Sequence, residues 1–65
     1  MQVFINQISH ELPTGATLQT AITLVNAQAP FATAVNLVFV PNSQYEKKIL
    51  QAEDRIDIIS PVTGG

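Results

Sequence analysis

This sequence has no cysteine and contains few basic residues and few glycines. The 65 residues include no cysteine, one histidine, three basic residues and three glycines. No disulfide can form, and His10 alone cannot build a metal site. Three cations are too few for the clustered lysines and arginines that bind nucleic acid. We therefore expect a single domain over residues 1–65, stabilised by packing, with no metal and no nucleic-acid partner.

The charged residues are distributed unevenly along the chain. The net charge is −2, and Glu11 is the only charged residue before position 46. The other seven are Glu46, Lys47, Lys48, Glu53, Asp54, Arg55 and Asp57. One interpretation is a solvated charged edge on a small fold, and the other is a neutral face that docks a protein.

Targeting signals and catalytic motifs are also missing. No basic segment followed by an apolar run opens the chain, and no apolar run approaches the roughly 20 residues that span a bilayer. Gly15 is isolated, so there is no glycine-rich phosphate loop. The carboxylates of Glu53, Asp54 and Asp57 lie among basic residues, which favours a solvated turn over an acid–base pair. We expect a cytoplasmic protein that is not an enzyme, binds no cofactor and has no membrane partner.

Hydrophobic periodicity predicts four or five strands and one helix. Strands are expected at Met1–Asn6, at Ile8–Leu12 and at Arg55–Ile59. The residues from Thr17 to Ala27 predict a helix that begins at a threonine cap and fades before Pro30. The uncharged run Val35–Val40 is either one buried strand or two short strands joined by a turn at Asn36. Tyr45 falls in a short irregular or single-turn segment.

The order of these elements defines a fold class. The helix presents one apolar stripe, which we expect to pack against the first and last strands. The stripe consists of Leu18, Ala21, Ile22 and Val25, and the facing strand residues are Val3, Ile5, Ile56 and Ile58. The predicted fold is α+β, a mixed sheet of four to five strands with one main helix on one face. With the last strand beside the first, this is the β-grasp, or ubiquitin-like, arrangement.

Two of the three glycines are the final two residues, Gly64 and Gly65. Because glycine has no Cβ, such an end can enter a narrow channel and adopt backbone angles closed to other residues. Residues 60–65 are expected to form a flexible tail outside the sheet, spanning at most about 20 Å if extended. That reach suits delivery of a carboxylate to another enzyme for activation as an acyl-adenylate. The alternative is a frayed terminus with no chemistry.

Seven short segments along the chain are informative when their order and spacing are considered together. They are Met1-Gln2-Val3 through Asn6, Gly15-x-Thr17, Ala34-Val35-Asn36, Val40-Pro41, Tyr45, Asp54-Arg55-Ile56 and Val62-x-Gly64-Gly65. In this order and spacing they resemble the ThiS family, the sulfur carriers of thiamin biosynthesis, which often has tryptophan where Tyr45 stands. The resemblance implies that a ThiF-type adenylating enzyme uses ATP to activate Gly65, with Gly64 as its narrow-channel neighbour. A sulfur donor protein then supplies sulfur for a thiocarboxylate, and thiazole synthase accepts it.

The chain departs from the family pattern at two expected turns and after Pro41. The family often has glycine after the residue matching Asn36, and here Leu37, Val38 and Phe39 follow. If exposed, these three form a candidate partner-docking surface. The family often has arginine where Asn42 stands and Gly-Asp where this chain has Glu53-Asp54, so that turn lacks glycine. The rival interpretations are a sulfur carrier for another pathway, such as molybdopterin synthesis or tRNA thiolation, and a ubiquitin-like interaction module that is never activated.

Overall fold

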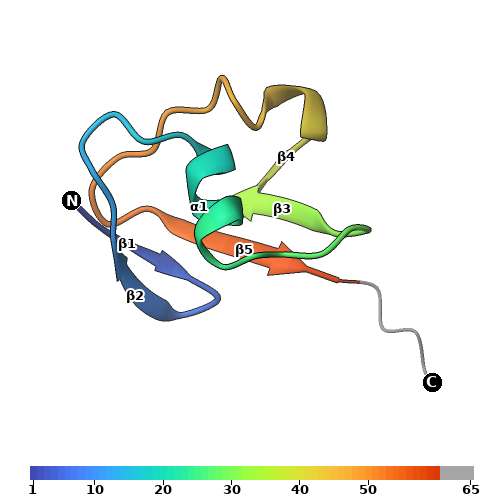
Figure 1. The fold of residues 1–65 in the computed structure, drawn as a ribbon, viewed down its shortest axis with the longest axis horizontal. Helices are drawn as coiled ribbons and strands as arrows, with labels where there is room; N and C mark the ends of the chain where they lie inside the picture. Colours follow the sequence, from blue (N-terminus) through green and yellow to red (C-terminus); the bar gives the residue numbers. More distant parts are fainter. Residues whose placement is uncertain (61–65) are drawn as a thin grey trace.

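The structure is a computed structural model that describes residues 1–60, and it contains one five-stranded sheet with a helix on one face (Figure 1). The elements are β1 Gln2–Ile5, β2 Ile8–Glu11, α1 Leu18–Leu24, β3 Ala32–Val35, β4 Val38–Val40, the 3₁₀ turn Asn42–Gln44 and β5 Arg55–Ile59. The strand order is β2-β1-β5-β3-β4. This mixed sheet with its single main helix confirms the predicted β-grasp class.

The last strand, β5, lies in the middle of the sheet. It pairs in parallel with β1, where Phe4 faces Arg55, and antiparallel with β3, where Val35 faces Ile56. The parallel pair needs a crossover connection, and the segment carrying α1 provides it. The prediction that the last strand lies beside the first is therefore confirmed. Strands β2 and β4 form the two edges.

The helix α1 is shorter than the sequence pattern predicts. Thr17 is its N-cap, as expected, and Thr17 and Thr20 form a reciprocal capping box. The helix ends at Leu24, three residues before the expected Ala27, because Asn26 adopts a left-handed φ of +54°. The amides of Asn26 and Ala27 then donate to the carbonyl oxygens of Thr23 and Ile22. This pattern is a Schellman motif, which stops a helix by satisfying its last carbonyls.

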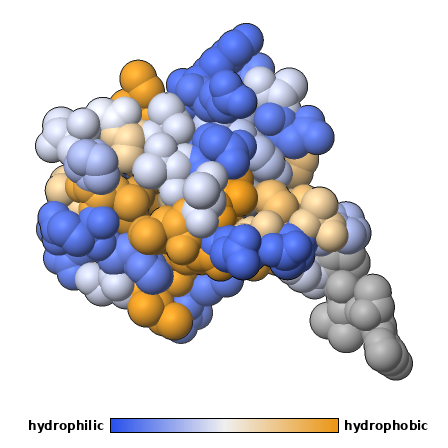
Figure 2. All heavy atoms as spheres, in the orientation of Figure 1, coloured by the Kyte–Doolittle hydropathy of each residue, from blue (hydrophilic) through white to orange (hydrophobic). Residues whose placement is uncertain are grey.

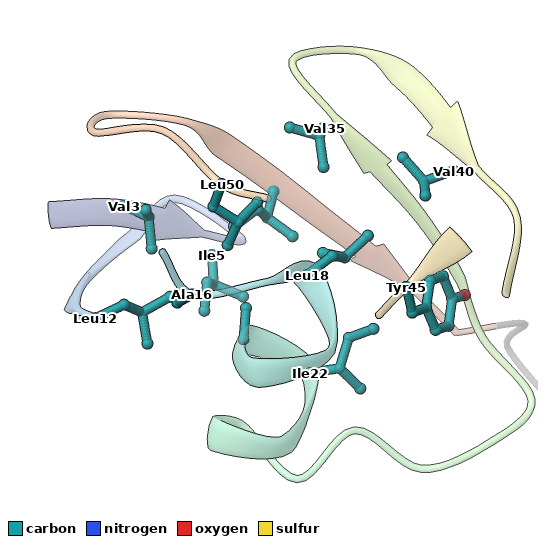
Figure 3. Close-up of a cluster of buried hydrophobic side chains, with 12 residues drawn as sticks. Val3, Ile5, Leu12, Ala16, Leu18, Ile22, Val35, Val40, Tyr45 and Leu50 are labelled. Atoms are coloured by element: carbon teal, nitrogen blue, oxygen red, sulfur yellow. The ribbon is translucent and has the colours of Figure 1, made fainter. Parts of the chain in front are cut away.

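The hydrophobic core lies between α1 and the helix-facing side of the sheet (Figure 3). The buried apolar residues are Val3, Ile5, Leu12, Ala16, Leu18, Ala21, Ile22, Val35, Val40, Tyr45, Leu50 and Ile56. Three of the four helix residues predicted to pack inward are buried, and the fourth, Val25, is half-buried against the core. His10 is half-exposed on β2. Ile8 pairs with the buried Ile5 but is itself exposed, because it lies on the edge strand.

Two tight turns at non-glycine residues resolve the ambiguity at Asn36. Asn36 and Leu37 have φ values of +50° and +71°, so the run Val35–Val40 is two strands joined by a turn, and the single-strand alternative is wrong. Asn6 and Gln7 repeat the same pair of angles between β1 and β2. Positive φ at both central residues is typical of a type I′ hairpin turn, in which asparagine is favoured first.

The segment 51–54 corrects the prediction of a wholly solvated acidic turn. The side chain of Asp54 is only 8 % exposed, and its carboxylate accepts hydrogen bonds from Asn36 Nδ2 at 3.0 Å and from the Gln51 amide at 2.8 Å. Glu53 adopts φ +69°, so this turn uses a left-handed residue although it has no glycine. Asp54 is therefore a buried structural residue that joins the β3–β4 turn to the start of β5.

Candidate functional site

The strand that leads to the C-terminal glycines is held on both sides. The amide of Asn6 donates to the Ile56 carbonyl at 2.8 Å, and Asn6 Oδ1 accepts from the Ile58 amide at 2.8 Å. On the opposite side, Asn36 Oδ1 accepts from the Arg55 amide at 3.0 Å. The asparagines of the two I′ turns thus fasten β5 from both neighbouring hairpins. Gly64 and Gly65, the residues predicted to carry and present the modified carboxylate, lie outside the described residues.

The predicted docking residues Leu37, Val38 and Phe39 are all exposed, at 90 %, 66 % and 66 %. We call these three residues the edge patch. Val38 pairs with Val35, a core residue, so its side chain lies on the helix-facing side of the sheet. Phe39 pairs with Ala34 and lies on the opposite, outer side, because successive strand side chains alternate. The edge patch therefore wraps around the β4 edge and does not face in one direction.

A shallow pocket of about 510 Å³ lies on the outer face of the sheet, between the two I′ turns. Phe4, Arg55 and Asp57 line it, together with Gln7 and Leu37. The Arg55 guanidinium lies 5.6 Å from the centre of the Phe4 ring, which is a cation–π contact. Sequence reasoning did not identify this site. The sequence feature that could have predicted it is the alternation in β1, because Phe4 must point to the side of the sheet opposite the buried Val3 and Ile5.

Exposed apolar side chains occur both in the nearly uncharged part of the chain and in the charged part that follows it. The large ones are Ile8, Leu24, Leu37, Val38, Phe39, Ile49 and Ile59. Figure 2 shows apolar atoms across the middle of one face, interrupted by hydrophilic residues. Five of them precede Glu46, in nearly the same proportion as the described residues as a whole, so docking by the neutral region stays a prediction.

Few charges are paired within residues 1–60. The one ion pair in this part of the chain joins the amino group of Met1 to Glu11, at 3.0 Å. Lys47, Lys48 and Arg55 have no carboxylate partner among the described residues. In the same region, no three histidine, aspartate or glutamate side chains are grouped so that they could hold a metal ion. Nor is any helix of residues 1–60 long and apolar enough to cross a membrane.

Known proteins resemble this chain in sequence pattern and in fold. The sequence model of the ThiS family matches residues 3–65. The crystal structure of the thiamine biosynthesis protein ThiS from Geobacter metallireducens superimposes with a TM-score of 0.82 at 9 % identity, and all of each chain is covered. No curated protein sequence matches significantly. At 9 % identity the structural likeness is evidence for the fold, whereas the family match extends over nearly the whole chain. The chain therefore belongs to the ThiS family.

Proposed function

We propose that this protein is a sulfur carrier of thiamin biosynthesis that works as a co-substrate of other enzymes and is not itself an enzyme. The observation that carries this proposal is the ThiS family match over residues 3–65. The β-grasp fold and the Gly64-Gly65 end are consistent with it. A carrier needs only to present its carboxylate, so the lack of a catalytic constellation in the sequence agrees with this role.

The chemistry is proposed to take place at Gly65. In a ThiF-type partner, a carboxylate oxygen of Gly65 attacks the α-phosphorus of ATP, which forms an acyl-adenylate and releases pyrophosphate. The adenylate makes the carbonyl carbon electrophilic, because AMP is a far better leaving group than an oxide. A sulfide equivalent from a sulfur donor protein then attacks that carbon and AMP departs. The resulting thiocarboxylate is a sulfur nucleophile that thiazole synthase can consume.

The fold contributes by holding the point from which the tail starts. Ser60 directly follows β5, which is paired on both sides and fastened by Asn6 and Asn36. A partner that binds the sheet therefore receives the tail from a defined position, which lowers the entropy lost on entry to its active site. No cysteine of the chain competes for the activated carbonyl.

The edge patch is the proposed docking surface for the adenylating partner. Leu37 combines two features that do not favour stability: it is 90 % exposed, and it adopts φ +71°. A branched residue in the left-handed region is uncommon, and glycine would relieve it. Binding of a partner would explain why an apolar side chain is retained in this exposed and strained position.

Intact-mass measurement tests the chemistry directly. The protein is incubated with ATP, a sulfur source and the adenylating enzyme of its own host. We expect a product in which one oxygen is replaced by sulfur. Gly64→Val should fold and dock normally but resist adenylation, because a branched Cβ obstructs a narrow channel. Deletion of Gly65 should prevent modification, because the carboxylate no longer reaches ATP.

The rival functions give different results in the same measurement. An unmodified wild-type protein would favour an interaction module that is never activated. Modification of both variants at the wild-type rate would refute the roles of Gly64 and Gly65. A thiocarboxylate that forms but is not consumed by thiazole synthase would point to a carrier for molybdopterin synthesis or tRNA thiolation.

A further inference from the structure

A second hollow, of about 280 Å³, lies beside the edge strand β4. Its apolar lining comes from Val35, Val38, Phe39, Val40 and Pro41, and its polar lining comes from Gln44, Lys47 and Lys48. We call it the lysine groove. Figure 1 shows β4 leading into the 3₁₀ turn, so the groove is formed by the edge strand and the segment that immediately follows it.

The charge of the groove is opposite in sign to that of the whole protein. The net charge is −2, yet two of the three basic residues lie in this groove. Both lysines are exposed, and neither has a carboxylate partner within residues 1–60. Glu46, their sequence neighbour, is not part of the lining. The groove is therefore a local cationic site with an apolar floor.

The backbone of β4 also offers an unpaired donor and acceptor at this place. The amide of Asn36 donates to the Arg55 carbonyl, on the β5 side of β3. Because backbone groups along a strand point alternately to its two neighbours, Ala34, two residues earlier, also directs its N–H and C=O toward β5. Phe39 pairs with Ala34, and its N–H and C=O must then point away from the sheet. No loop hydrogen bond within residues 1–60 uses either group. Pro41, the next residue after Phe39 whose backbone faces outward, has no N–H, so it cannot donate to an added strand.

We propose that the lysine groove binds an extended acidic segment of a partner protein, which adds a strand at Phe39. The strand backbone would pair with Phe39, one apolar side chain would fill the hollow beside Val38, and carboxylates would meet Lys47 and Lys48. Nucleic acid fits the groove less well, because its binding requires more than two cations and makes no use of an apolar floor. This inference concerns protein recognition alone and holds whether or not Gly65 is activated.

NMR amide mapping with two synthetic peptides tests the proposal. The first peptide alternates valine with glutamate, and the second has lysine in place of each glutamate. We expect the acidic peptide to shift the amide signals of Phe39, Lys47 and Lys48 at millimolar concentration, and the basic peptide to leave them unchanged. Added salt should weaken binding, since exposed ion pairs are screened.

Variants with matched charge identify the site. Lys47→Gln combined with Lys48→Gln lowers the net charge by two, and so does Arg55→Glu on the outer face. The double variant should bind the acidic peptide roughly fivefold to tenfold more weakly, as expected for two exposed ion pairs, whereas Arg55→Glu should stay within about twofold of wild type.

Four results would overturn the proposal. They are equal binding of the two peptides, wild-type affinity in the double variant, shifts centred on Phe4 and Arg55, and the same shifts on raising the protein concentration alone. The last result would identify a second copy of the chain as the occupant. None of them depends on thiocarboxylate formation, so failure here is distinct from failure of the proposed carrier function.

Discussion

Replacing Leu37 by glycine should raise stability and weaken docking, so the two effects can be separated. The φ of Leu37 is +71°, and its side chain is 90 % exposed. A left-handed conformation costs a non-glycine residue about 1–2 kcal/mol, and so exposed a side chain recovers little of this by burial. Glycine avoids that cost but loses about 0.5–1 kcal/mol more backbone entropy on folding. The expected result is a free energy of unfolding about 0.5–1 kcal/mol higher.

Urea and thermal unfolding measure the first effect. For a domain of this size, the increase corresponds to a Tm higher by roughly 2–8 °C. Gln7→Gly is the matched control, because Gln7 has the same φ of +71°, is exposed and occupies the same place in the β1–β2 turn. Both variants should be stabilised to a similar extent.

Affinity for the adenylating partner measures the second effect. If Leu37 is buried in the complex, its loss should weaken binding at least about tenfold, since burial of a leucine side chain contributes about 1.5–3 kcal/mol. Gln7→Gly should leave this affinity unchanged. Destabilisation by Leu37→Gly alone would show that the leucine packs against its own domain. Wild-type affinity in that variant would refute its role as a docking anchor.

Three further substitutions test the interior. Ile22→Ala should lower the free energy of unfolding by about 2–5 kcal/mol in a urea melt, because Ile22 is buried between α1 and the sheet; an unchanged free energy would contradict that burial. Asp54→Ala should lower it by about 1–3 kcal/mol, since two donors lose their buried acceptor. Asn36→Ala should also lower the free energy of unfolding. The double variant with Asp54→Ala should lose less than the sum of the two single losses, because the two side chains share a hydrogen bond. Strict additivity would exclude that contact.

Several features of the fold follow from local sequence signals. The alternation in β1 and β5 and the spacing of Leu18, Ala21 and Ile22 predict which side chains are buried. Thr17 predicts the start of the helix, because its hydroxyl is well placed to cap the first turn. These predictions succeed because each depends on residues close together in the chain.

Features that depend on distant contacts were mispredicted or left open. The burial of Asp54 depends on Asn36, which is 18 positions earlier in the chain. The turn at Leu37 has no local glycine signal, and it is stabilised by Asn36 bonding to the backbone of β5. The early end of α1 is different, because it is local: a left-handed Asn26 stops the helix, and hydrophobic periodicity does not reveal that backbone angle.

The sequence by itself determined the fold class, the buried residues of the helix and the family resemblance, because hydrophobic spacing and short motifs are read along the chain. The tertiary structure alone decided where the surface features lie. It brought Phe4 and Arg55 together on the outer face, placed Val38 and Phe39 on opposite sides of one edge, and set Lys47 and Lys48 beside that edge. The physical reason is that strand register and chain reversal decide which distant side chains meet, and neither is specified by local composition.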